Sequence, residues 1–322
     1  MRSEIRRRDL LTGSLGVAAL SGCSRRRAPG ELPRVTIVRA SAYSDDLIGK
    51  IRALFAEHRL DVRGKRVLLK PNLVEYDPGT TINTHPSLVL AAYEVLRSMD
   101  AADVRVAEGP GHRRATLDLA EAAGYFAAFS QFESLFTDLN LDEVSLVEFP
   151  RRFSRLKKAY LPSTVLGCDL LVSMPKMKTH HWVGATLSMK NLFGLVPGGV
   201  YGWPKNVLHW AGIQECIADL CTLFPRTFAI VDGIEGMEGN GPIQGKSKHA
   251  GVLVAGDDLV AVDATCCRIM GIDPSKVRYL RLCEDRGQTE AENVLQTGES
   301  ISEVRTPFEL IPEFQSIRLV GA

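Results

Sequence analysis

The chain has 322 residues, enough for one large domain or two of modest size. Its composition is that of a globular protein, with 45% hydrophobic and 24% charged residues, and its formal net charge is +1. Because the charges nearly balance, composition points to neither a nucleic acid nor an acidic polymer, and we expect no nucleic-acid partner.

The first residues predict an export signal. Arg7 and Arg8 precede an apolar run that ends at Leu20 and is too short to span a bilayer. This order is typical of a twin-arginine signal peptide, which we assign to residues 1–22. The run continues into Ser-Gly-Cys, which is similar to a bacterial lipoprotein cleavage box, so that Cys23 becomes the lipid-bearing first residue. The alternative is a disordered basic tail.

This signal predicts where the protein resides. We expect an exported protein of the cell envelope, anchored to the membrane by lipid on the periplasmic side. The twin-arginine route carries folded proteins, which suits a domain that acquires a cofactor before export. Residues 23–33 contain arginines, prolines and a glycine, and we interpret them as a linker.

From residue 34 onward, apolar runs alternate with amphipathic segments. The runs predict buried strands at residues 34–38, 66–70, 103–108, 169–176, 228–233 and 251–256. Apolar residues recurring every three or four positions predict helices at 45–58, 85–99, 115–129, 210–224 and 259–271. The alternation predicts a layered α/β fold, with a mostly parallel sheet and helices on both faces. One arrangement of this fold has two lobes around a cleft, formed by residues 34–165 and 166–322.

Polar residues follow four of the predicted strands. In sheets of this kind, ligands bind outside the carboxyl ends of the strands, so these positions are candidates for a site. The residues concerned are Lys70 and Asn72, Glu108 and His112, the lysines after residue 175, and Asp232 with the acids that follow it.

The segment 173–198 combines lysines and histidines with apolar and glycine-rich sequence. If residues 174–180 are extended, Lys176, Lys178 and His180 lie on one side, because side chains alternate along a strand. A helical pattern follows, and such a junction aims several cations at one point, where a carboxylate, phosphate or anionic cofactor would bind. Taken singly, each lysine is also explained as an exposed surface residue.

Crowded cations require a compensating negative charge. We therefore expect Glu108, or an acid of the segment 232–238, beside the lysines. In that segment Asp232, Glu235 and Glu238 lie among glycines, which leaves two interpretations: oxygen ligands of a divalent cation, or a polar wall of the same site.

The cysteines do not define a site. None of the seven forms a CxxC motif, and their spacing matches no iron–sulfur or zinc site, so we expect no iron–sulfur cluster in this chain. Apart from Cys23, we interpret the cysteines as free thiols. The alternative is a disulfide formed in an oxidising compartment, and the sequence does not show which cysteines would pair.

Several motifs together resemble a known family. In chain order they are LLKPNLVEYDPGTTINTHP, VAEGPG, MPKMKTHHWVGATLSMKNLFGLVPG, VDGIEGMEGNGPIQG and DDLVAVDATCCRIMG. Over residues 34–287 they resemble the DUF362 family of bacterial and archaeal proteins, whose general activity is not established. Many members carry a ferredoxin-type iron–sulfur module whose cysteines are missing here.

The same stretches are more distantly similar to the N-terminal domain of nickel-pincer lactate racemases. In that family, histidines act as acid and base, and a lysine holds a pyridinium-derived nickel cofactor. The resemblance implies His112 and His180 as the acid/base positions and Lys190 as the cofactor lysine.

Three functions fit the sequence. We favour a lipid-anchored enzyme or cofactor-binding protein that acts on a small anionic molecule; the cofactor is open between a divalent metal and a metal-organic group. The alternatives are a non-catalytic ligand- or metal-binding lipoprotein, and a partner of an iron–sulfur protein in a redox system. The candidate residues are Lys70, Asn72, Lys176, Lys178, Lys190 and Asn191 for binding, and His180, His112 and His85 for proton transfer.

Overall fold

The structure is a computed structural model of the chain, and it describes residues 31–112, 114–224, 226–285 and 287–321. The predicted signal peptide, Cys23 and the linker up to residue 30 lie outside the described residues. Within the described part, no helix combines the length and the apolar character needed to cross a bilayer.

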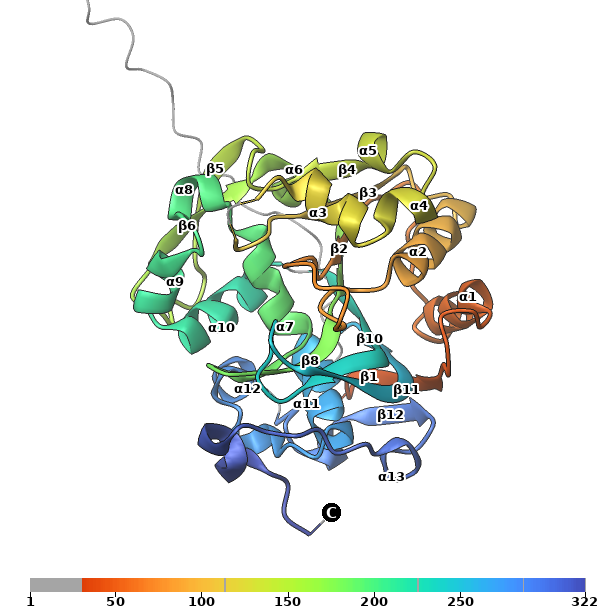
Figure 1. Cartoon of the computed structure of the whole chain (residues 1–322), viewed down its shortest axis with the longest axis vertical. Coiled ribbons are helices and arrows are strands. Elements are labelled where there is room, and N and C mark those ends of the chain that lie inside the picture. Colours follow the sequence, from red (N-terminus) through yellow and green to blue (C-terminus); the bar gives the residue numbers. More distant parts are fainter. Residues whose placement is uncertain (1–30, 113, 225, 286, 322) are drawn as a thin grey trace, which may run out of the picture.

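A ten-stranded sheet runs through the molecule, and most of its neighbouring strands are parallel (Figure 1). Its main path is β12-β1-β11-β10-β7-β2-β3-β4, and β8 and β9 extend it beside β10. A separate hairpin is formed by β5 and β6. The strands are β1 (Arg34–Arg39), β2 (Arg66–Pro71), β3 (Asp103–Glu108), β4 (Phe136–Asp138), β5 (Val144–Glu148), β6 (Lys158–Pro162), β7 (Leu170–Met174), β8 (Lys176–His180), β9 (Gly184–Thr186), β10 (Thr227–Glu238), β11 (Lys246–Gly256) and β12 (Leu295–Gly298).

Helices cover both faces of this sheet, which confirms the predicted class. α1 (Leu47–Glu57) and α2 (Pro86–Ser98) pack on one face, to the right in Figure 1; α10 (Ile213–Leu223) and α11 (Leu259–Ile269) pack on the other. The shorter helices are α3 (Thr116–Ala122), α4 (Tyr125–Ala128), α5 (Phe132–Leu135), α6 (Ser163–Leu166), α7 (Ser188–Asn191), α8 (Gly198–Tyr201), α9 (Asn206–Trp210), α12 (Arg278–Cys283) and α13 (Ile301–Val304), with 3-10 turns at Leu192–Leu195, Pro274–Lys276, Ala291–Asn293 and Pro312–Ile317.

Strand β2 shows why the predicted strands are apolar throughout. Val67 and Leu69 belong to the core beneath α1 and α2, whereas Leu68 belongs to the core on the side of α10 and α11. Successive side chains of a strand point to opposite faces, so a strand covered by helices on both sides needs apolar residues at every position.

Two predictions of local structure are wrong. The helix predicted at 115–129 is broken into α3 and α4 at Gly124, whose φ of 85° is a conformation that favours glycine. The strand predicted at 228–233 is longer than expected: it continues through the acidic segment to Glu238, where β10 forms a hairpin with β11. Its glycines are accommodated within the strand.

Both predicted lobes contribute to the one sheet. β7, from the segment 166–322, lies between β2, from the segment 34–165, and β10. In the parallel pairing of β2 with β7, Lys70 lies opposite Ser173, so the strands end at one edge of the sheet. The chain then passes Pro175 into β8, which pairs with the later part of β10. That edge therefore combines residues distant in sequence.

A buried aspartate fixes the short helix α7, which carries two of the predicted site residues. Asp263, on α11, accepts hydrogen bonds from the backbone N–H groups of Ser188 (2.8 Å) and Met189 (3.0 Å) and from the Ser188 hydroxyl. These N–H groups begin α7 and have no partner within the helix. Asp263 is fully buried, where a carboxylate needs such donors. α11 thereby fixes the position from which α7 presents Lys190 and Asn191.

Candidate functional site

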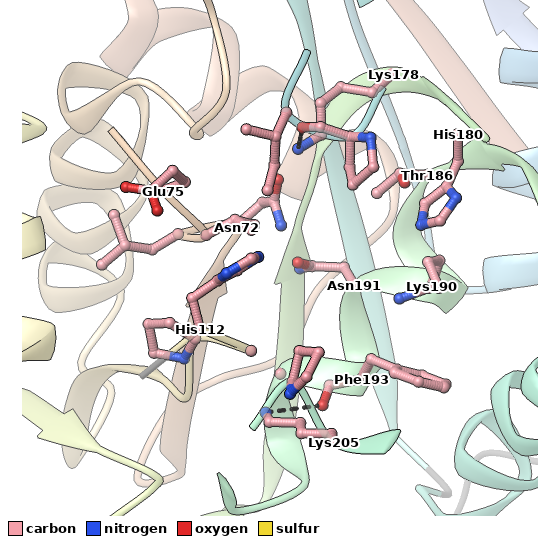
Figure 2. Close-up of a pocket in the computed structure, with 18 of the residues that line it drawn as sticks. Asn72, Glu75, His112, Lys178, His180, Thr186, Lys190, Asn191, Phe193 and Lys205 are labelled. Atoms are coloured by element: carbon pink, nitrogen blue, oxygen red, sulfur yellow. Dashed lines mark hydrogen bonds between the residues drawn. The ribbon is translucent and has the colours of Figure 1, made fainter. Parts of the chain in front are cut away.

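A cavity of about 470 Å³ opens at the carboxyl ends of β2 and β3, between them and the segment from β8 to α9 (Figure 2). In Figure 2, Asn72 and His112 lie on one side of it, and His180 and Lys190 on the other. Most of the candidates from the sequence line it: Lys70, Asn72, Glu108, His112, Lys178, His180, Lys190 and Asn191.

An ion pair between Lys70 and Glu108 lies at the buried base of this cavity. The Lys70 Nζ atom is 2.6 Å from Glu108 Oε2, and both side chains are buried. The two carboxylate oxygens also accept hydrogen bonds from the backbone N–H groups of Leu73 and Gly109, at 3.2 and 2.9 Å. Asn191 accepts from Lys70 through Oδ1 and donates to its carbonyl. The expected carboxylate beside the lysines is therefore Glu108.

The glycine at position 194 leaves room for this pair. A Cβ atom there would lie 1.9 Å from Glu108 Oε1 and 2.5 Å from Lys70 Nζ, so any other residue would displace the pair. The glycine lies in the LFGL turn that follows α7, and this explains in steric terms why a glycine occurs in that motif.

Three further lysines line the cavity without an ion pair to any carboxylate of the described residues: Lys178, Lys190 and Lys205. Lys178 donates to the carbonyls of Ile82 (2.9 Å) and Pro242 (3.1 Å). Lys205 donates to the carbonyls of Gly109 (2.6 Å) and Phe193 (3.3 Å). Carbonyl dipoles hold these ammonium groups in place but do not neutralise them. In their protonated forms, these lysines therefore give the cavity an excess of positive charge.

Burial makes these charges costly. It lowers the pKa of Lys190 to about 7, with repulsion from Lys70 as the second cause, and lowers the pKa of Lys205 to about 7 as well. Burial also lowers the pKa of Lys178 well below its ordinary value, and the charge of Lys176 adds to the effect. An anion among these lysines would favour their protonated forms.

His180 is a neutral imidazole in this setting. Burial, followed by the charge of Lys190, lowers its pKa well below the ordinary value. Its Nδ1 accepts a hydrogen bond from the backbone N–H of Trp182 (3.0 Å), which places the proton of the neutral ring on Nε2. The side chain can therefore donate a hydrogen bond from Nε2. His112 lines the rim of the cavity and is exposed.

Some polar atoms of the lining are buried and have no hydrogen-bond partner within the described structure. They are Asn72 Oδ1, Thr186 Oγ1 and His209 Nδ1. Asn72 and Thr186 belong to the lining of the cavity and are themselves 7% and 4% exposed. An unpaired buried polar atom costs about 1–3 kcal/mol, which a ligand could recover.

Two predicted site residues, Lys176 and His85, do not line the cavity. Lys176 lies opposite Asp232 in the pairing of β8 with β10, and its Nζ is 2.6 Å from Asp232 Oδ2 and 2.8 Å from the Tyr43 hydroxyl. The His85 ring stacks on Tyr43 and accepts from the backbone N–H of Ser87 at the start of α2. The expectation that both join the lysine site is corrected, because these closer partners hold them elsewhere.

The three carboxylates considered as metal ligands also have separate partners. Asp232 pairs with Lys176, Glu235 with His249 (2.7 Å), and Glu238 with Lys248 (3.3 Å). None of the three lines the cavity. Within the described ranges, no three His, Cys, Asp or Glu side chains come together as metal ligands would. The structure thus places these three carboxylates neither together, as ligands of one divalent cation would lie, nor in the polar wall of this cavity.

Fold and cavity define a class of protein: a layered α/β protein with a cationic site at the ends of its central strands. The model of the "Domain of unknown function (DUF362)" matches residues 67–268, and the chain belongs to this family. The matched range includes every cavity residue named above, and it confirms the family predicted from the motifs.

One curated protein and one solved structure are described here as similar to this chain. The thylakoid-associated protein sll1697 of Synechocystis sp. is 26% identical over 264 residues, which are 79% of each chain. The lactate racemase apoprotein of Thermoanaerobacterium thermosaccharolyticum aligns with a TM-score of 0.42 and 11% identity, over 74% of this chain and 57% of that one. The chain thus matches little more than half of the racemase, and a likeness of this extent supports no inference about the site.

The low pKa of Lys190 predicts a pH-dependent effect of its removal. In the unfolded chain a lysine titrates near 10.5, so between pH 7 and 10.5 the unfolded state binds more protons and the wild type gains stability as pH rises. A shift from 10.5 to about 7 corresponds to about 4 kcal/mol at pH 7. Because the Lys190 side chain is partly exposed, we expect Lys190→Met to raise the free energy of unfolding by about half of that, roughly 2 kcal/mol, at pH 7, and this gain to fall away towards pH 10.5.

Urea unfolding of the ligand-free proteins at pH 7 and pH 10 measures this difference. Lys157→Met is the matched control, because it removes the same charge from an exposed side chain. A gain for Lys190→Met that is equal at both pH values would contradict the account.

Proposed function

We propose that the protein binds a small organic anion in this cavity and acts on it as an enzyme or cofactor-binding protein. The observation that carries the proposal is the charge of the lining. Lys178, Lys190 and Lys205 lack a carboxylate partner among the described residues, while the Glu108 carboxylate is already held by Lys70. An anion bound among these three lysines would supply the negative charge that they lack.

Repulsion among the lysines disfavours their charged forms in the ligand-free cavity. Two like charges about 8 Å apart repel by roughly 2 kcal/mol at an effective dielectric constant of 20. In the ligand-free cavity this repulsion acts together with burial, and both depress the lysine pKa values. A bound anion replaces repulsion by attraction, and a carboxylate or phosphate also accepts the charge-assisted hydrogen bonds that ammonium groups form well.

The other polar groups would orient such a ligand. The unpaired atoms of Asn72 and Thr186 supply hydrogen bonds, and Asn191 is held in a fixed orientation by Lys70 and Ser173. His180, neutral and with its proton on Nε2, is suited to donate a hydrogen bond from that nitrogen to a ligand that lies against Lys190. His112 at the rim is the remaining candidate for proton transfer.

Analysis of molecules released from the purified protein tests this proposal. We expect denaturation of the wild type to release an anionic compound in near-stoichiometric amount, identified by mass spectrometry in negative-ion mode. The yield should fall at least tenfold in Lys178→Met and Lys190→Met, because each loses a cation of the lining. Lys157→Met should release as much as the wild type; equal release from all four proteins would contradict the proposal.

We also propose that the protein is exported by the twin-arginine route and anchored by lipid at Cys23. The order of Arg7-Arg8, the apolar run and the cleavage box supports this. The name of the relative from Synechocystis describes it as thylakoid-associated, which is a membrane location.

Replacement of the lipid-bearing residue tests the anchor. Cys23→Ser should move the protein from the membrane pellet to the soluble fraction, since a serine cannot carry the lipid. Replacing Arg7 and Arg8 together by lysine should stop export and leave the precursor in the cytoplasm. Membrane association that is unchanged in Cys23→Ser would contradict the proposed anchor.

A further inference from the structure

Basic side chains gather on the connection between β5 and β6, away from the cavity. In the segment 148–160, five basic residues accompany a single acid, Glu148, which pairs with Arg152 at 3.2 Å. The other four are exposed and form no ion pair with a carboxylate of the described residues: Arg151, Arg155, Lys157 and Lys158. Because the whole chain has a net charge of only +1, this concentration of positive charge is local.

The fold holds this connection in a fixed place. The backbone N–H groups of Phe153 and Ser154 donate to the buried Asp219 of α10, at 2.7 and 2.9 Å. The N–H of Arg155 donates to the carbonyl of Ala211, just beyond α9, at 3.1 Å. The basic segment therefore lies directly against α9 and α10, and Figure 1 shows β6, α8 and α9 together on the left of the molecule.

Large apolar side chains are exposed beside the basic segment. Val207 and Trp210 lie three positions apart on α9, hence on one side of the helix, and are 37% and 73% exposed. Tyr160 of β6 is 41% exposed, and its N–H donates to the hydroxyl of Tyr201 on α8 (2.8 Å), next to the exposed Val200. A tryptophan is stabilised by burial, so the position of Trp210 is not explained by the packing of the described chain.

Together these residues form what we call the basic–aromatic face: Arg151, Arg155, Lys157, Lys158, Val207 and Trp210. Surfaces that lie on a lipid bilayer have this composition. Basic side chains attract anionic headgroups, and a tryptophan places its apolar ring at the edge of the hydrocarbon region while its N–H stays in the polar region.

The proposed lipid anchor favours a membrane over other anionic partners. Eight residues lead from Cys23 to Glu31, the first described residue, and eight residues span at most about 28 Å. An anchored protein would therefore always have one of its faces within reach of the bilayer. This support rests on the proposed anchor, whereas the composition of the face does not.

We propose that the basic–aromatic face binds the surface of a bilayer that contains anionic phospholipids. The attachment is reversible and sensitive to salt, because each basic side chain near an anionic surface contributes only about fivefold in affinity. The face therefore orients the protein on the membrane and does not replace the lipid anchor. A protein that lacks the lipid is released when membranes are washed.

Quenching of tryptophan fluorescence by brominated phospholipids tests this contact. The full chain with Cys23→Ser supplies a protein without lipid, and its emission reports only on the domain, because the tryptophans are Trp182, Trp203 and Trp210. We expect brominated vesicles of phosphatidylcholine and phosphatidylglycerol to quench the emission at low salt. Brominated phosphatidylcholine alone, or about 1 M salt, should prevent the quenching, because binding requires unscreened charge. Trp210→Phe should remove at least half of it.

Two matched pairs of arginines test the charge. Arg151→Gln with Arg155→Gln should raise at least tenfold the lipid concentration that gives half-maximal quenching. Arg52→Gln with Arg59→Gln is the control, because these exposed arginines lie on α1 and just beyond it, on the right in Figure 1, and should change nothing.

Three results would overturn the proposal: no quenching by the anionic vesicles, quenching retained in full by Trp210→Phe, or equal weakening in the two double variants. Emission that responds to polyglutamate but not to the vesicles would assign the face to an acidic protein and overturn it as well. All these measurements use protein without lipid at Cys23, so a failure of the proposed anchor is tested separately.

Discussion

The buried ion pair between Lys70 and Glu108 is the interaction on which the candidate site depends. It joins the carboxyl ends of β2 and β3 and reaches Asn191 on α7, so it fixes three elements relative to one another. Removing one partner of such a pair costs about 3–5 kcal/mol, because the other charge stays buried and unpaired. The pair also uses the Glu108 carboxylate, which forms no ion pair with the other lysines of the described cavity. The positive charge of the cavity follows from that.

Neighbouring groups hold the lysines that carry this charge in fixed positions around the cavity. Asp263 fixes the start of α7 and thereby the position of Lys190, while backbone carbonyls fix the ammonium groups of Lys178 and Lys205. Lysine side chains at a surface would gain entropy by spreading apart, whereas these are held where their pKa values fall. Holding these lysines close together lowers the stability of the ligand-free protein. A bound anion would restore that stability, and this gives the arrangement a physical reason.

Much of this site could be predicted from the sequence, because the strands of a parallel sheet end at the same edge. Lys70 and Lys178 are far apart in the chain, yet both follow strands of one sheet, and the rule of strand ends brings them together. Period two also predicted that Lys176 joins Lys178 in the site, but Lys176 does not line the cavity. Asp232 of β10 lies opposite Lys176 of β8, and this pairing depends on a strand register that a single sequence does not show. Lys205 and His209 were missed because they lie between the predicted elements, and only the tertiary fold brings them to the cavity.

The central claim is that the cavity carries positive charge which its own carboxylates do not balance. Anomalous diffraction from a crystal soaked in sodium selenate tests it most directly, because the selenium marks the position of a dianion. The account predicts a selenate ion among Lys178, Lys190 and Asn72, absent from crystals of Lys190→Met treated in the same way. Selenate found at other lysines of the surface but not in the cavity of the wild type would contradict it.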